Sequence, residues 1–280
     1  MKFLYVIVLF SSISAVFSQS CTNPDELENC VYKSAFMLNR DAKLPENIDE
    51  MKETCSNGQN SINCLLSFND KCVIGPPKIT MKRIYETVQR GLNDRCSNNE
   101  KLQEFIDHLK CLRDDPNKIE MVRKCSDRHI RHLEMIVEVS ENERAGPVCC
   151  AFKYFYGCIK DVVTSQCDND VAEYFETILS EYVNNVLYNI FYYYYYFFFL
   201  IIFYFIFFLF FLSFFKQQKD ELLMAMCEQY SDMDKCAANL PANVWQPMKQ
   251  IIDQTDKIEH KYKSTIPLMF RLLDKYIKKE

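Results

Sequence analysis

Fourteen cysteines limit what this chain of 280 residues can fold into more than any other feature of its sequence. Their number is even, and in a secreted protein such a set is typical of a disulfide framework. No Cys-x-x-Cys pair occurs, so zinc-binding or thioredoxin-like chemistry has little support. We expect bridges, with a connectivity that the sequence leaves open, among Cys21, Cys30, Cys55, Cys64, Cys72, Cys96, Cys111, Cys125, Cys149, Cys150, Cys158, Cys167, Cys227 and Cys236.

The first 18 residues have the pattern of a secretory signal peptide. Lys2 supplies a positive charge, residues 3–10 form an apolar stretch, and the segment from Ala15 to Ser18 ends in the small residues that signal peptidase favours. We therefore predict a signal peptide over 1–18 and a secreted, extracellular protein. Such a location is oxidising, which agrees with the use of cysteine as a structural staple.

Several cysteines are nine positions apart along the chain. Within one continuous helix that spacing spans about 13.5 Å and half a turn, so the two side chains face opposite sides and lie too far apart to bond. Each member would then reach a different neighbour. The segment between Cys55 and Cys64 is loop-like, and direct pairing is less clearly excluded there. The pairs are 21 and 30, 55 and 64, 149 and 158, 158 and 167, and 227 and 236.

Apolar residues recur at helical spacing throughout the chain, and only 5 glycines occur, few for an all-β sandwich. We predict an all-α, disulfide-rich bundle of roughly ten short helices, which occupies 19–182 and continues over 218–280. The clearest apolar stripes are Ile84, Val88 and Leu92; Leu102, Phe105, Ile106 and Leu109; Ile130, Leu133, Ile136 and Val137; and Val171, Phe175, Ile178, Leu179 and Tyr182.

Helix boundaries are predicted where residues that favour N-caps follow a cysteine, and at prolines. The first kind of signal occurs directly after Cys55, Cys96 and Cys125. The second kind occurs at Gly75-Pro76-Pro77, Asp114-Asp115-Pro116, Ala145-Gly146-Pro147, Pro241 and Pro247.

An aberrant apolar insert, residues 183–217, interrupts this pattern. About 20 apolar residues are enough to cross a bilayer, so a transmembrane helix is one interpretation. Membrane helices, however, use small residues for packing and place aromatic residues at the two interfaces. Residues 188–215 are mostly Phe and Tyr and contain no Gly, Ala or Val.

A translated intron explains the composition of the insert better. Every residue from Leu187 to Leu212 belongs to a type that A and T alone can encode. Val183 and Asn184 fit a splice donor, the end of the insert fits a T-rich acceptor tract, and its 35 residues are whole codons. We therefore favour a translated intron. The alternative is a single-pass membrane protein. A membrane is a partner of the chain only if 186–215 is genuinely translated. That topology would place Cys227 and Cys236 in the reducing cytosol.

The sequence offers no positive evidence for catalysis, so we predict a protein that is not an enzyme and that uses no cofactor. No nucleophile elbow or phosphate-cradling glycine loop occurs. His129 and His132 are three positions apart on an expected helix and could share a metal, but no further ligand stands out, and we interpret them as solvated helix surface. The net charge of −5 comes without a basic stripe, which argues against nucleic acid as a partner.

The aromatic residues Phe152, Tyr154, Phe155 and Tyr156 are the candidate lining of an apolar pocket. Most of such a patch is expected to be core. Disulfide-stapled helical proteins can also enclose cavities, so a small apolar ligand or lipid is the possible partner. The function that we expect is binding or structural, in body fluid or a gland secretion, and a carrier of a small apolar ligand is the alternative.

One resemblance adds to this interpretation. The stretches IDEMKETCSNGQNSINCLLSFNDKC, GLNDRCSNNEKLQEFIDHLKCL, VCCAFKYFYGCIKDVVTSQC and LLMAMC resemble the insect haemolymph glycoprotein family in the spacing of their cysteines and helical stripes. The resemblance covers roughly 48–227 and implies a secreted, cysteine-rich helical fold without an established activity. Departures are the absence of glycosylation sequons, the adjacent Cys149 and Cys150, and the insert.

Overall fold

The computed structural model describes Cys21, Cys227 and residues 27–31, 43–178, 229–254 and 258–277. This part of the chain is all-α, as predicted, with about ten helices. Residues 169–178 are also helical. The bounded elements are α2 (Glu28–Val31), α3 (Ile48–Cys72), α4 (Pro76–Arg95), α5 (Asn99–Arg113), α6 (Pro116–Val137), η2 (Glu141–Glu143), α7 (Ala145–Gln166), α10 (Met233–Asn239), α11 (Ala242–Asp253), α12 (Ile266–Arg271) and η3 (Asp274–Tyr276).

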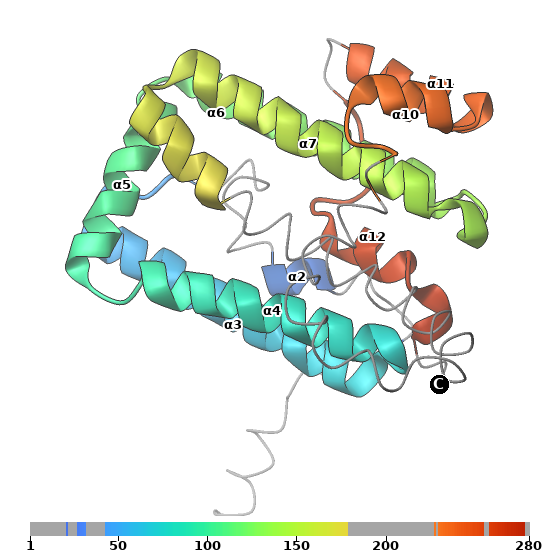
Figure 1. Ribbon diagram of the computed structural model, residues 1–280. Coiled ribbons are helices and arrows are strands. Elements are labelled where there is room, and N and C mark those ends of the chain that lie inside the picture. The colour runs from blue at the N-terminus through green and yellow to red at the C-terminus, as the bar shows by residue number, and fades with distance from the viewer. Residues whose placement is uncertain are drawn as a thin grey trace, which may run out of the picture.

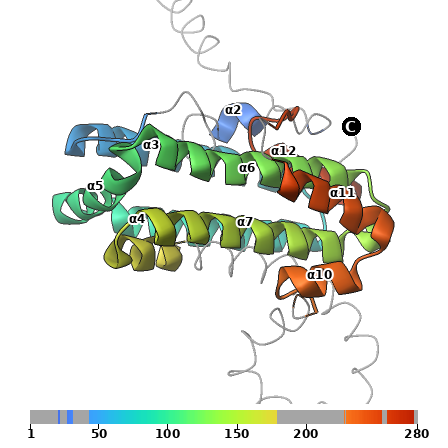
Figure 2. The same cartoon turned by 90° about the horizontal axis from the view of Figure 1, so that it is seen from above.

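Two pairs of long helices form the frame of the molecule. Helices α3 and α4 lie side by side, as do α6 and α7, and α5 joins the two pairs at one end (Figure 1). The short helices α2 and α12 lie between the pairs, where α2 contacts α3 and α12 contacts α6 (Figure 1). From above, α10 and α11 lie at the opposite end from α5 (Figure 2). The chain thus returns to the α6–α7 pair after the insert.

Several predicted helix boundaries are confirmed, and each has a local cause. Asn98 caps α5, since its side chain accepts a hydrogen bond from the backbone N–H of Lys101 at 3.0 Å. Asp115 caps α6 in the same way through Asn117, and Pro116 takes the first helical position, where no N–H is needed. The sequence signals were right where an N-cap side chain or a proline met the end of an apolar stripe.

Three predicted boundaries are wrong. The signals after Cys55 and after Cys125 lie inside the continuous helices α3 and α6, which run for 25 and 22 residues. Pro247 lies inside α11, which continues through it. An N-cap residue competes with the helix only locally, whereas burial of the apolar face over several turns favours continuation. Ser126 illustrates this, because its hydroxyl donates to the Val122 carbonyl of its own helix at 3.5 Å.

Every cysteine is paired, and seven disulfides tie the helices together with Cα atoms 5.2 to 6.1 Å apart. No two cysteines nine positions apart bond to each other, as predicted. Cys55 and Cys64, the pair that the sequence left open, both lie on α3 and reach different partners. The bonds are Cys21–Cys72, Cys30–Cys64, Cys55–Cys96, Cys111–Cys167, Cys125–Cys158, Cys149–Cys227 and Cys150–Cys236.

The apolar side chains form two separate cores along the length of α3, α6 and α7. Core A is formed by residues from the later half of α3, from α10, α11 and α12, and from the junction of α6 with α7. Its centre includes Phe68, Leu133, Ile136, Phe152, Met248 and Phe270. Core B lies at the α5 end, and its centre includes Met51, Leu109, Leu112, Val122, Ile159 and Phe175. The predicted stripe from Leu102 to Leu109 is buried in core B.

None of the described helices has the length and the apolar composition that a membrane crossing requires. The predicted signal peptide, residues 1–18, and the insert, residues 183–217, lie outside the described residues.

Candidate functional site

Helix α6 carries a set of polar side chains that the fold buries. Asp127 and Glu134 are 6% and 8% exposed, and His129 and His132 are 1% and 0% exposed. The interpretation of the two histidines as solvated helix surface is therefore wrong. The helix is covered on more than one side, by α7, α11 and α12, so its buried face is wider than the apolar stripe of the sequence. Buried polar groups of this kind require partners.

The two histidines meet the aromatic residues predicted to line a pocket. The His129 ring stacks on Phe155 with centroids 4.6 Å apart and lies edge-on to Phe152 at 4.7 Å. The His132 ring lies edge-on to Tyr154 at 5.4 Å. Three of the four predicted residues are thus brought together around α6.

Tyr156, the fourth predicted residue, points elsewhere. Its hydroxyl donates to the Glu176 carboxylate at 3.2 Å, and Lys160 donates to the same oxygen at 2.6 Å. The contact joins α7 to the helical residues 169–178. The structure therefore divides the predicted patch into a histidine-facing part and a separate polar contact at the surface.

Burial keeps both α6 histidines neutral. Loss of hydration lowers the pKa of His129 from 6.5 to about 3, and the neighbouring His132 adds to this, while a backbone hydrogen bond with Ala151 opposes it. Loss of hydration also lowers the pKa of His132 to about 4, against a backbone hydrogen bond with Met248. The His132 Nε2 atom lies 3.1 Å from that carbonyl oxygen and donates to it. These rings therefore act as neutral packing groups near pH 7.

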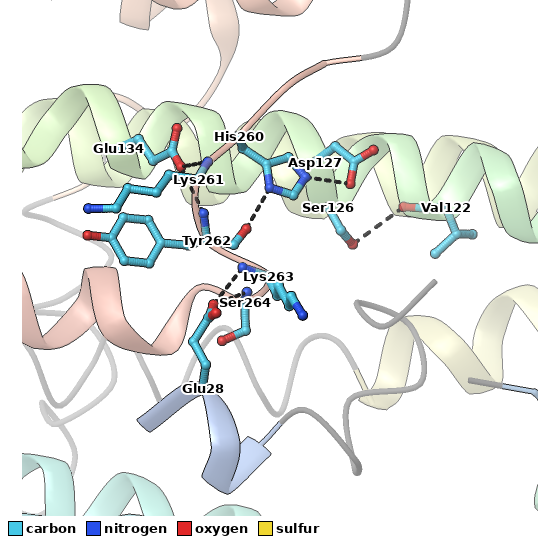
Figure 3. Close-up of polar contacts among 10 residues, drawn as sticks. All are labelled: Glu28, Val122, Ser126, Asp127, Glu134, His260, Lys261, Tyr262, Lys263 and Ser264. Carbon is cyan, nitrogen blue, oxygen red and sulfur yellow. Dashed lines mark hydrogen bonds and ion pairs between the residues drawn. The ribbon is translucent and has the colours of Figure 1, made fainter. Parts of the chain in front are cut away.

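A second polar cluster joins α6 and α2 to residues 258–264, which we call the strap (Figure 3). The Glu134 Oε1 atom accepts from the backbone N–H groups of Lys261 at 2.5 Å and Tyr262 at 3.2 Å. Glu28 Oε1 accepts from the next two amides, Lys263 at 2.5 Å and Ser264 at 2.8 Å. Two carboxylates thus satisfy four consecutive backbone donors of a segment that forms no helix or sheet.

His260 forms the third attachment of the strap. Its Nε2 atom lies 3.1 Å from Asp127 Oδ1, and its Nδ1 atom lies 2.5 Å from the Tyr262 carbonyl oxygen (Figure 3). The hydrogen bond with Asp127, opposed by partial burial and helped by the Tyr262 carbonyl, raises the pKa of His260 above 6.5. Both ring nitrogens therefore face acceptors.

This geometry suits attachment rather than chemistry. A general base needs a ring nitrogen that is free to accept a proton, but both nitrogens of His260 are directed at oxygen acceptors. Ser126, the hydroxyl residue next to Asp127, donates to the carbonyl of Val122 instead of to an imidazole. Within the described ranges, no three His, Cys, Asp or Glu side chains are placed to hold a metal ion.

Sequence reasoning missed Glu28, Asp127, Glu134 and His260. One signal was available, because Asp127 and Glu134 are seven positions apart and lie on one face of α6, beside the apolar stripe through Ile130. Two acidic residues at that spacing next to a core face indicate a buried polar contact. Their partners in the strap lie more than 120 positions away in the chain, and no local pattern could identify them.

No family model, curated protein or solved structure matches this chain. The resemblance to the insect haemolymph glycoprotein family therefore rests on the spacing of cysteines and helical stripes and stays a prediction.

Proposed function

We propose that this is a secreted extracellular protein of body fluid or a gland secretion, with a binding or structural role and no catalytic activity. The observation that carries the proposal is the complete pairing of its cysteines into seven disulfides, which are present in both cores. Such a framework forms and persists in oxidising compartments and is rare in the cytosol. The buried acids and histidines of α6 serve attachment and packing, which gives no support to catalysis.

Two disulfides favour the secreted form over the single-pass membrane alternative. Cys149 bonds Cys227 and Cys150 bonds Cys236, so each bond joins chain on opposite sides of the insert. A single crossing between 183 and 217 would put the two members of each pair on opposite faces of a bilayer, where they could not meet. The pairing supports a common compartment for both parts, and it agrees with our hypothesis that the insert is a translated intron.

The test combines transcript and protein. Reverse-transcription PCR across the codons for Tyr182 and Gln218 is expected to give a product shorter by three bases for each of the 35 residues of the insert. The protein encoded by that product should leave a secretory host cell in soluble form, and peptide mapping without reduction should recover Cys149–Cys227 and Cys150–Cys236. A long transcript alone, with the product retained in carbonate-washed membranes, contradicts the proposal.

A carrier of a small apolar ligand is the second candidate. It is favoured by Tyr154 and Phe155, which are only partly buried on α7 although they contact buried neutral histidines. Such rings provide apolar contact area for a ligand. The protein without the insert should bind a fluorescent fatty-acid probe in a saturable and displaceable way, and Phe155→Ala should weaken that binding.

The matched control for that experiment is Ile79→Ala, because Ile79 is an exposed aliphatic residue on α4. It should leave the binding of the probe unchanged. Equal losses from both variants, or probe binding that unlabelled fatty acid does not displace, would remove the carrier function and leave the secreted structural protein intact.

A further inference from the structure

One of the three attachments of the strap depends on the protonation of a single residue. His260 has two ring nitrogens, and each lies within hydrogen-bond distance of an oxygen that accepts but does not donate, the Asp127 carboxylate and the Tyr262 carbonyl. A neutral imidazole has one N–H group, whereas an imidazolium has two. Only the charged form satisfies both acceptors.

We propose that the strap is a pH-dependent device: the His260 imidazolium fastens residues 258–264 to α6, and loss of one proton as the pH rises loosens them. Deprotonation removes one of the two hydrogen bonds of the His260 ring and its charge attraction to the Asp127 carboxylate, which is almost fully buried. Loss of a charge-assisted hydrogen bond at a buried place weakens the arrangement that the bond holds. The strap then loses its attachment at its first contact with α6.

The charged groups around the strap favour the imidazolium. Asp127 and Glu134 both add an attraction for positive charge at His260. Arg131 lies on the other side of Glu134, with its Nη1 atom 3.0 Å from Oε2, and leaves Oε1 to the strap amides. Other charges near the strap are Glu259, Lys261 and Lys263 within it, Glu28 on α2, and Arg271 on α12, whose guanidinium lies 5.4 Å from the Tyr262 ring centroid.

The direction of the pH effect follows from these contacts. Since the folded protein raises the pKa of His260 above 6.5, its stabilising contribution is complete below pH 6.5 and is lost as the pH rises through the folded pKa. Mild acid therefore closes the strap and alkaline conditions release it. Release of the strap exposes two of its own buried residues, Ser264 and Tyr262, and Tyr262 belongs to core A.

Two measurements on the full-length secreted chain test the device. Nuclear magnetic resonance titration of the ring signals should give His260 a pKa above 6.5. Hydrogen exchange, corrected for the intrinsic pH dependence, should show the amides of residues 261–264 at least about tenfold less protected at pH 9.5 than at pH 6, as expected for the loss of one charge-assisted hydrogen bond.

The variant His260→Gln should remove this pH dependence. The control is His108→Gln, which removes a histidine of α5 that stacks on Tyr174, far from the strap in sequence, and should retain the dependence. A titration of His260 at or below 6.5 in the unmodified protein, or protection of the four amides that is equal at both pH values, overturns the proposal whether or not the variants fold.

Discussion

Core A and core B use the same three long helices but are closed in different ways. Core B draws its buried residues from one continuous stretch, between Leu44 and Phe175, and its three disulfides join cysteines 33 to 56 positions apart. Core A needs chain from both sides of the insert, and two of its disulfides join cysteines 78 and 86 positions apart. Core B is thus the local half of the fold and core A the remote half.

The two cores also differ in their polar content. Among the described residues, Asp127, His132 and Glu134 are buried, and each has a polar partner between 248 and 262, in the remote chain that closes core A. Apolar packing has little directionality, whereas hydrogen bonds to a carboxylate specify both position and orientation. The difference teaches that remote segments are placed by directed polar contacts, while local segments need little more than an apolar stripe.

Complete reduction should have the largest effect, because the seven disulfides together stabilise the protein by more than the 5–15 kcal/mol that is typical of whole domains. We expect loss of the helical circular dichroism signal in excess reductant. At limiting reductant the partly buried bonds, which include Cys30–Cys64 of core A, should be reduced first. Cys55, Cys96, Cys111 and Cys167 in core B are only partly buried, so their bonds should be reduced before Cys150–Cys236, which is fully buried.

Alkylation followed by peptide mass spectrometry gives the order in which the bonds are reduced. An unmodified chain should be included without reductant as the control. Simultaneous labelling of all cysteines would contradict this order, and retention of the melting temperature after full reduction would contradict the framework itself.

Acid should weaken core A before core B. The two α6 histidines have pKa values of about 3 and about 4 in the folded protein, so unfolding takes up protons as the pH falls below 6.5. From pH 6.5 to 5 this lowers the free energy of unfolding by about 3 kcal/mol, a window in which the contribution of His260 is already complete. Hydrogen exchange should show faster opening of α11 and α12 than of α5.

The variant His132→Gln separates this effect from other titrations. Glutamine keeps a donor for the Met248 carbonyl but does not titrate, so about half of the loss should disappear. An acid-induced loss of the same size in His132→Gln would show that other groups cause it.

The loss of stability on removal of a single disulfide should increase with the length of the loop that the disulfide closes. The chain-entropy model gives about 4.6 kcal/mol for Cys150–Cys236 and about 3.7 kcal/mol for Cys125–Cys158. Replacing both members of a pair by serine and measuring unfolding in denaturant tests this order. Without the 35-residue insert the value for Cys150–Cys236 falls to about 4.1 kcal/mol. The measured loss of stability therefore also indicates whether the insert is present. A larger loss of stability on removal of Cys125–Cys158 than on removal of Cys150–Cys236 would contradict this order.

Two glycines of α7 give the smallest and sharpest test. A methyl group at Gly146 would lie 2.6 Å from the Tyr230 hydroxyl, on a residue that follows the insert, so Gly146→Ala should destabilise core A by about 1–3 kcal/mol. No atom lies within 4 Å of the same position at Gly157, so Gly157→Ala should stabilise the helix by up to about 1 kcal/mol. Thermal unfolding gives the change in melting temperature of each variant. A change in the same direction for both variants would contradict the prediction.

Much of core B and little of the candidate site could be predicted from the sequence. The stripe from Leu102 to Leu109 recurs every third or fourth residue, and that spacing alone specifies a helix with one buried face. The nine-residue spacing of Cys149 and Cys158 on one helix excluded their direct bond for the same geometric reason, whereas Cys55 and Cys64 stayed open until both were found on α3. These are relations between neighbours in the chain, which the sequence records directly.

The sequence by itself determined the all-α class, the use of cysteine as a staple and the apolar face of each long helix. Only the tertiary structure decided which cysteines pair, that His129 and His132 are buried, and that Asp127 and Glu134 hold the strap. The physical reason is distance along the chain. Helical periodicity follows from local geometry, whereas burial and pairing follow from which remote segment covers a given face, and that is settled only when all segments pack together.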